Sequence, residues 1–204
     1  NKAAAAALKS SNVAAGALAT LAKDNMVNQL IITEDGAIQP LVDLLKNKTS
    51  AHKADSYVNP TKALWHLAAT ADNQATIAQA GGIEPLVSLL TSQSELTKQY
   101  AAAALEFLVH DHAAAQDVAK AGAIAPLIEL LGSDSDQTQE HAKGALLSLA
   151  TQDLSSRDAV VQKLVGVLEV RNASAQLKAA EALAVLAAKS DENRKAITAA
   201  NAIK

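Results

Sequence analysis

One ten-residue pattern occurs three times in this chain: GAIQPLVDLL at residues 36–45, GGIEPLVSLL at 81–90 and GAIAPLIELL at 122–131. Its isoleucines, Ile38, Ile83 and Ile124, are 45 and 41 residues apart. A repeat of roughly 40–47 residues is typical of all-helical arrays in which consecutive units stack. The pattern therefore predicts an α-solenoid.

A second pattern follows each decapeptide and also occurs once more: KALWHLAA at 62–69, AALEFLVH at 103–110, GALLSLAT at 144–151 and EALAVLAA at 181–188. Each copy has two leucines three positions apart, which places them on one face of a helix. A single repeat cannot cover that face, so neighbouring repeats have to bury it by stacking. The leucines expected in the shared core are Leu64, Leu67, Leu105, Leu108, Leu146, Leu149, Leu183 and Leu186.

A further helix is expected at 72–81, 113–122 and 191–200. Gly82 and Gly122 at its end would permit a positive backbone angle and a sharp turn. Pro40, Pro85 and Pro126 then fall in the first turn of the next helix, where a missing amide proton costs little. The predicted unit is a short helix, a sharp turn, a medium helix, a loop and a long helix.

Two copies depart from this spacing. The first has four extra residues within 46–60, which predicts a longer loop, with Asn59 as the cap and Pro60 in the first turn of the following helix. The fourth copy, at 158–168, has no glycine turn and carries Lys163 in place of proline, although Leu168 keeps the spacing of 15 residues to Leu183. We expect its first two helices to be shortened or fused, with a local change of curvature.

Composition excludes several classes of function. Among 204 residues, 18 are basic and 21 acidic, a formal charge of −3, so no overall field attracts nucleic acid. The chain has no cysteine, which removes disulfides, thiol catalysis and cysteine-based zinc sites and fits an intracellular solenoid, either cytoplasmic or nuclear. No uncharged apolar run reaches the roughly 18–20 residues that a membrane span needs, so membrane insertion is not expected.

The three-helix order with the pattern G-[AG]-I-x-P-L-[VI]-x-L-L resembles the armadillo repeat family over essentially the whole chain, whereas two-helix HEAT repeats fit less well. The resemblance implies a right-handed superhelix with about four complete units. We place these units at residues 25–71, 72–112, 113–152 and 153–190, with partial units at 1–24 and 191–204. This single solenoid segment resembles a part of a longer chain or of a larger complex.

The resemblance also implies a concave groove lined by the long third helices, where proteins or extended peptides commonly bind. Nuclear import adaptors of this family hold the peptide backbone with asparagines, each preceded four residues earlier by a tryptophan. The asparagine positions fall here on Thr20, His66, Phe107, Ser148 and Val185, and the tryptophan positions on Gly16, Lys62, Ala103, Gly144 and Glu181. The chain therefore resembles generic protein-binding solenoids more than import adaptors.

The groove is expected to present a mixed set of side chains suited to a particular partner: Lys62, Trp65, His66, Tyr100, Phe107, His110, His141, Ser148, Thr151, Lys178 and Glu181. Trp65 is the only tryptophan, and it could either fill a gap in the core or anchor a partner at the interface.

Metal binding and catalysis find little support in the sequence. His110 and His112 are two residues apart and would point away from each other on a helix, so the stretch 110–112 is better explained as a solvated helix end than as a zinc site. The nucleophile elbow, the P-loop, the dinucleotide-binding turn and the H-E-x-x-H pattern are all missing from the sequence. We therefore expect no catalytic residue, no metal site and no cofactor.

These observations predict a non-catalytic scaffold or adaptor segment that binds a protein or an extended peptide in the third-helix groove. One alternative is a substrate-recruiting region of a larger enzyme such as a ubiquitin ligase. Another is a structural subunit of a larger assembly.

Overall fold

The computed structural model describes residues 2–47, 54–152 and 154–202, and its regular structure in these ranges is helical. The elements are α1 (Lys2–Ala22), α2 (Met26–Glu34), α3 (Ile38–Lys46), the 3₁₀ helix η1 (Ala54–Tyr57), α4 (Val58–Ala68), α5 (Ala71–Gln79), α6 (Ile83–Leu89), α7 (Glu95–Leu108), α8 (His112–Lys120), α9 (Ile124–Leu130), α10 (Asp136–Gln152), α11 (Leu154–Val167), α12 (Ala173–Lys189) and α13 (Asp191–Ala202). Within the described ranges, none of the helices is both long and apolar enough to cross a bilayer.

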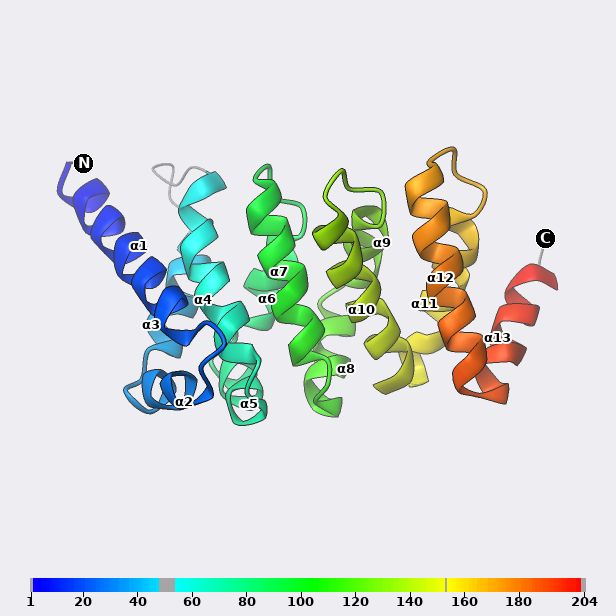
Figure 1. Cartoon of the computed structure of the whole chain (residues 1–204), viewed down its shortest axis with the longest axis horizontal. Coiled ribbons are helices and arrows are strands. Elements are labelled where there is room, and N and C mark those ends of the chain that lie inside the picture. The colour runs from blue at the N-terminus through cyan, green and yellow to red at the C-terminus, as the bar shows by residue number, and fades with distance from the viewer. Residues whose placement is uncertain (1, 48–53, 153, 203–204) are drawn as a thin grey trace.

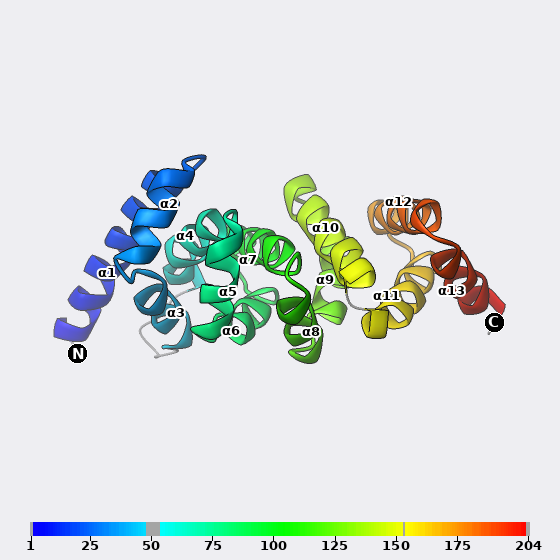
Figure 2. The same cartoon turned by 90° about the horizontal axis from the view of Figure 1, so that it is seen from below.

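The helices form an elongated array with the chain ends at opposite ends of its long axis (Figure 1). Helices α1, α4, α7, α10 and α12 stand side by side in chain order and form the layer nearest the viewer, which we call the third-helix layer. Helices α3, α6, α9 and α11 lie behind it, as the view in Figure 2 also shows. The predicted solenoid of helical triplets is confirmed.

The lengths of the first two helices in a unit differ from the prediction. Helices α5 and α8 have 9 residues each, whereas α6 and α9 have 7 each. In the second and third units the first helix is thus longer than the second, whereas α2 and α3 of the first unit have 9 residues each.

The shared core is built from the predicted leucine pairs. All eight of those leucines are buried, with exposed fractions between 0 and 8 %. Alanines complete the core, and four consecutive ones on α7, at positions 101–104, are fully buried between α4 and α10. Small side chains let neighbouring helices approach closely. The leucines and alanines together explain how a chain with only 2 % aromatic residues fills its interior.

The sharp turn before each second helix uses a glycine one position earlier than predicted in the second unit. Gly36, Gly81 and Gly122 have φ values of 78°, 73° and 83°, so Gly122 is confirmed and Gly82, at φ −79°, is not the left-handed residue. Gly82 is needed for space instead, since an added Cβ would lie 2.8 Å from Ile77 Cγ2. Gly81 therefore supplies the left-handed backbone conformation of the turn, and Gly82 allows close packing against Ile77.

The helix starts also differ in one place. Pro40, Pro85 and Pro126 each occupy the third position of a second helix, as predicted. Asn59 is not a cap, because η1 leads into α4 and that helix already begins at Val58. The Asn59 side chain instead donates a hydrogen bond to the Asn12 carbonyl of α1, at 3.1 Å. Most of the inserted loop, at 48–53, lies outside the described residues.

In the fourth unit the first two helices are fused, as one of the two predicted outcomes. Helix α11 runs without a turn from Leu154 to Val167 and buries Val160, Val161, Leu164 and Val165. Leu168 is 38 % exposed, whereas its counterparts at positions 90 and 131 are 1 % and 0 % exposed. Leu168 lies just beyond the end of α11 at Val167, so its preserved spacing to Leu183 does not place it in the core.

Side chains from each following helix close the carboxyl ends of three long helices, a feature that the sequence analysis missed. The donors are the third and fourth residues of α2, α5 and α13. Each donates a hydrogen bond to a carbonyl near the C-terminal end of the preceding long helix, α1, α4 or α12. The bonds are Asn28 to Leu21 O, Gln29 to Ala22 O, Asn73 to Leu67 O, Gln74 to Ala68 O, Asn193 to Leu186 O and Arg194 to Ala187 O, at 2.7–3.0 Å. At the junction of α7 and α8 the equivalent residues are Ala114 and Ala115.

Replacing Leu105 with Ala should lower the free energy of unfolding by about 2–5 kcal/mol, because it leaves a cavity in the core between repeats. Leu177→Ala, at a leucine that is 57 % exposed on α12, is the matched control and should cost far less. Urea unfolding followed by circular dichroism measures both. A cost below about 1 kcal/mol for Leu105→Ala would contradict the burial described here.

Replacing Asn73 with Ala should lower the free energy of unfolding by about 1–3 kcal/mol, because the carbonyls of Leu67 in α4 and Gln29 in α2 would lose their donor. Gln79→Ala is the control, because Gln79 is exposed and lies on α5, as Asn73 does. Hydrogen exchange of the amides in α4 and α5 provides the readout, and equal protection in the two variants would show that the bridging amide contributes nothing.

Candidate functional site

All eleven predicted groove residues lie on the third-helix layer or in the turn that follows one of its helices. Helix α4 carries three of them, α7 and its following turn three, α10 three and α12 two. The structure brings six of the eleven into two groups, one of which also includes Glu140 and Lys143. We call Trp65, His66, Tyr100 and His141 the aromatic cluster, and Glu140, Lys143, Lys178 and Glu181 the ion-pair network.

The aromatic cluster spans three consecutive long helices. The Trp65 ring of α4 stacks on Tyr100 of α7, with centroids 5.3 Å apart and an interplanar angle of 16°. It also stacks on His66 at 4.3 Å and meets the edge of His141 of α10 at 5.8 Å. Stacked and edge-to-face rings at these distances attract one another beyond their area burial. Trp65 therefore connects the faces of three repeats.

Trp65 combines features of both alternatives that the sequence left open. It is half-buried and packs against the hydrophobic core, and it keeps part of its surface exposed. Phe107, one helix along, is also half-buried and meets the exposed His110 edge-on, with centroids 6.3 Å apart. Both aromatic side chains thus have a packed side and a free side on the same layer.

His66 is more deeply buried than a groove contact requires. Its exposed fraction is 7 %, and its Nε2 has no hydrogen-bond partner among the described residues. Burial lowers the pKa of His66, and the charge of Lys62 lowers it further, against an opposing effect of Asp24. The ring is therefore neutral near pH 7 and supports Trp65 from below.

Glu106 of α7 occupies a space that Gly144 of α10 leaves open. An added Cβ at Gly144 would overlap the Glu106 carboxylate, so a larger residue there would require the Glu106 side chain to move. Glu106 Oε2 lies 2.8 Å from Nδ1 of His141, which joins this pair to the aromatic cluster. Sequence reasoning placed Gly144 in the tryptophan position but did not identify Glu106. A glycine inside a long helix was the available signal.

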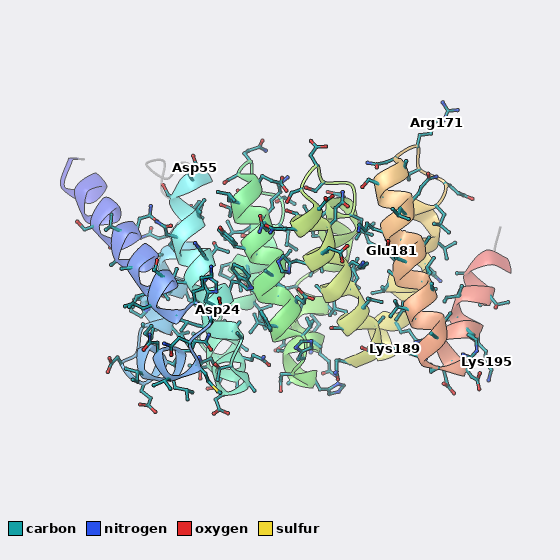
Figure 3. The ribbon with its side chains drawn as sticks, viewed as in Figure 1. Asp24, Asp55, Arg171, Glu181, Lys189 and Lys195 are labelled. Carbon is teal, nitrogen blue, oxygen red and sulfur yellow. The ribbon has the colours of Figure 1, made fainter. Side chains whose placement is uncertain are left out.

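The ion-pair network joins α10 to α12. Lys143 Nζ lies 2.8 Å from Glu140 Oε2 and 2.8 Å from Glu181 Oε2, while Lys178 pairs with Glu140 and lies 3.7 Å from Glu181. Figure 3 labels Glu181 on the side of α12 next to α10. The sequence signal was a reversal of charge in one register, since E-x-x-K at 140–143 is followed 38 residues later by K-x-x-E at 178–181.

Hydrogen bonds within the ion-pair network stabilise the charged forms of its members. Hydrogen bonds from the two lysines lower the pKa of Glu140, and the bond from Lys143 lowers the pKa of Glu181. Burial opposes the charge on Lys143, but its bonds to both glutamates raise the pKa of this lysine overall. All four groups are therefore charged at neutral pH and compensate one another.

The remaining predicted residues have local roles. Thr151 donates to the Leu147 carbonyl at 3.0 Å, and Ser148 is half-buried beside it. The stretch 110–112 lies at the junction of α7 and α8, where Asp111 caps α8 by accepting from the Ala114 amide at 2.8 Å. Among the described residues, no three histidine, aspartate or glutamate side chains form a group suited to a metal ion.

An apolar hollow of about 500 Å³ lies at the N-terminal end, between α1 and α3, and its lining includes Leu18, Pro40 and Leu44. One repeat further along, the equivalent space lies between α4 and α6, and there it is filled by α3, which packs against both helices. The hollow is therefore a stacking surface for a helix and does not resemble a small-molecule pocket.

Comparisons with known proteins agree with this architecture. The Armadillo/beta-catenin-like repeat family model matches residues 70–106 and 111–151. A structure of computationally designed armadillo repeat proteins for modular peptide recognition has 26 % identity and a TM-score of 0.74, covering 93 % of this chain and 81 % of its own. A designed armadillo repeat protein in complex with the peptide (KR)4 has 24 % identity and a TM-score of 0.74, covering 94 % and 81 %.

A natural structure is similar as well. The armadillo repeats only protein ARO from Plasmodium falciparum has 20 % identity and a TM-score of 0.68, covering 84 % of this chain and 78 % of its own. No curated protein matches the sequence. The repeats matched by the family model lie within one continuous stack that aligns with these solenoids over most of its length, and the chain therefore has the fold of an armadillo repeat solenoid.

Proposed function

We propose that this segment is a non-catalytic scaffold or adaptor that binds a protein or an extended peptide on the third-helix layer. The observation that carries the proposal is the aromatic cluster, which crosses α4, α7 and α10 on one face of the array. Half-buried aromatic side chains with a free face are the usual anchors of protein interfaces. Phe107 extends the same surface towards the end of α7.

The comparisons support a peptide-sized partner. Computationally designed armadillo repeat proteins with the same architecture are described as made for modular peptide recognition, and the structure of another designed one is in complex with the peptide (KR)4. An elongated layer of parallel helices presents side chains at regular intervals, which suits an extended chain better than a compact ligand. The recognition residues themselves are proposed here from their position on the layer.

A structural role in a larger assembly is the second candidate. The N-terminal end exposes Val13, Met26 and Val27, with exposed fractions of 64 %, 61 % and 66 %, and it also carries the apolar hollow between α1 and α3. Exposed apolar side chains that gather on one surface are typical of protein contact sites. This candidate places the contact at the end of the array, away from the third-helix layer.

A peptide selected from a random linear library displayed on phage should bind the third-helix layer. Replacing Tyr100 and Phe107 together with Ala should weaken that binding about tenfold or more, because two aromatic anchors are lost. Leu168→Ala, on the opposite layer, should leave it unchanged. Fluorescence anisotropy of the labelled peptide measures affinity, and circular dichroism checks that helicity is retained.

The emission of Trp65 offers an independent readout, since it is the only tryptophan in the chain. The selected peptide should shift this emission on binding. Full binding by the double variant, without any change in Trp65 emission in the unmodified chain, would place the site elsewhere and favour the end surface.

A further inference from the structure

The carboxylates of the third-helix layer are already occupied by bases of the same layer. Beyond the first turns of α4, α7, α10 and α12 the acidic residues are Glu106, Glu140 and Glu181. Glu106 pairs with His141, and the two other glutamates pair with lysines of the ion-pair network. A basic peptide would have to displace these internal partners before it could use the carboxylates.

Lys62 differs from the lysines of the network. It lies on α4 beside the aromatic cluster, with its Nζ 5.8 Å from the centroid of the Tyr100 ring. No carboxylate pairs with it in the part of the chain that the structure describes. An ammonium group at this distance from an aromatic face gains only a modest attraction. Lys62 therefore remains able to bind an external carboxylate.

Other charges near Lys62 do not cancel this. Lys23 and Asp24, at the end of α1, are both exposed and have opposite signs, so together they add no net charge. His66 is buried with a lowered pKa and stays neutral. Glu106 adds a carboxylate on the α10 side of the aromatic cluster, where it is hydrogen-bonded to His141, whereas Lys62 on the α4 side has no carboxylate partner among the described residues.

We propose that the partner is an acidic extended segment, with a carboxylate that binds Lys62 and an adjacent apolar side chain that packs on the exposed faces of Trp65 and Tyr100. This inference rests on the proposed function and specifies the partner class. The ion-pair network of α10 and α12 contributes no net charge, because it contains two lysines and two glutamates. The proposed preference for an acidic partner therefore depends on the region of α4 and α7. Complementary charge across an interface determines partner choice and association rate.

Three labelled peptides test this. They share one length and one frame of leucine and serine, and their variable positions are all aspartate, all asparagine or all lysine. The aspartate peptide should bind the intact chain about fivefold or more tightly than the asparagine peptide and more tightly still than the lysine peptide. The difference should shrink at high salt, because the charges are at the surface. Anisotropy and Trp65 emission report the binding.

Lys62→Glu should reverse the order of the aspartate and lysine peptides. Lys163→Glu is the matched control, because it makes the same change of net charge on an exposed side chain of α11, in the opposite layer, and the original order should persist.

Equal affinities for the three peptides, or tighter binding of the lysine peptide, would overturn the acidic partner and leave the proposed function intact. Failure of all three to bind a chain that still binds the phage-selected peptide would overturn it as well. If the phage selection itself gives no binder, the proposed function and this inference both fail.

Discussion

The fold depends on the burial of one leucine stripe per repeat against the neighbouring repeat. Leu105 and Leu108 of α7 are fully buried although α7 belongs to the third-helix layer, which is open on one side, because α4 and α10 cover the two flanks of α7. A lone helical triplet would leave this stripe in water, at a cost of roughly 1.5–3 kcal/mol for each leucine. Stacking is therefore the condition under which each unit is folded at all.

The same constraint determines which side chains are available for binding. With two leucines three positions apart turned inward, the residues of the opposite arc, such as Lys62, Tyr100 and Phe107, are placed on the open layer. Adjacent long helices then bring these residues close together across the seams. The aromatic cluster and the ion-pair network are both products of this register. Trp65 contacts Tyr100, 35 residues further along the chain, and Lys143 contacts Glu181, 38 residues further along.

Periodicity allowed the sequence to predict what is repeated, and much less of what is local. The leucine stripes, the prolines in the second helices and the fused α11 could be predicted because they follow from spacing. The left-handed residue at Gly81, the bond from Asn59 to α1 and the exposure of Leu168 could not, because they depend on where one helix stops and on what a neighbouring helix supplies. The partners of Glu106 and Lys143 depend on side-chain reach across a seam, which a linear pattern does not contain.

Recognition by such an array depends on how equivalent positions differ. The position of His66 is occupied by Phe107, Ser148 and Val185 in the next three long helices, and all four positions are helical. A ladder of identical amides would hold any peptide backbone, whereas this series changes from aromatic to polar to aliphatic. Gly144 adds to the difference, because its missing side chain leaves room for Glu106, which is hydrogen-bonded to His141, while Lys62 on α4 has no carboxylate partner among the described residues. The residues that differ between repeats therefore determine which partner the proposed surface would select, and the residues that recur stabilise the fold.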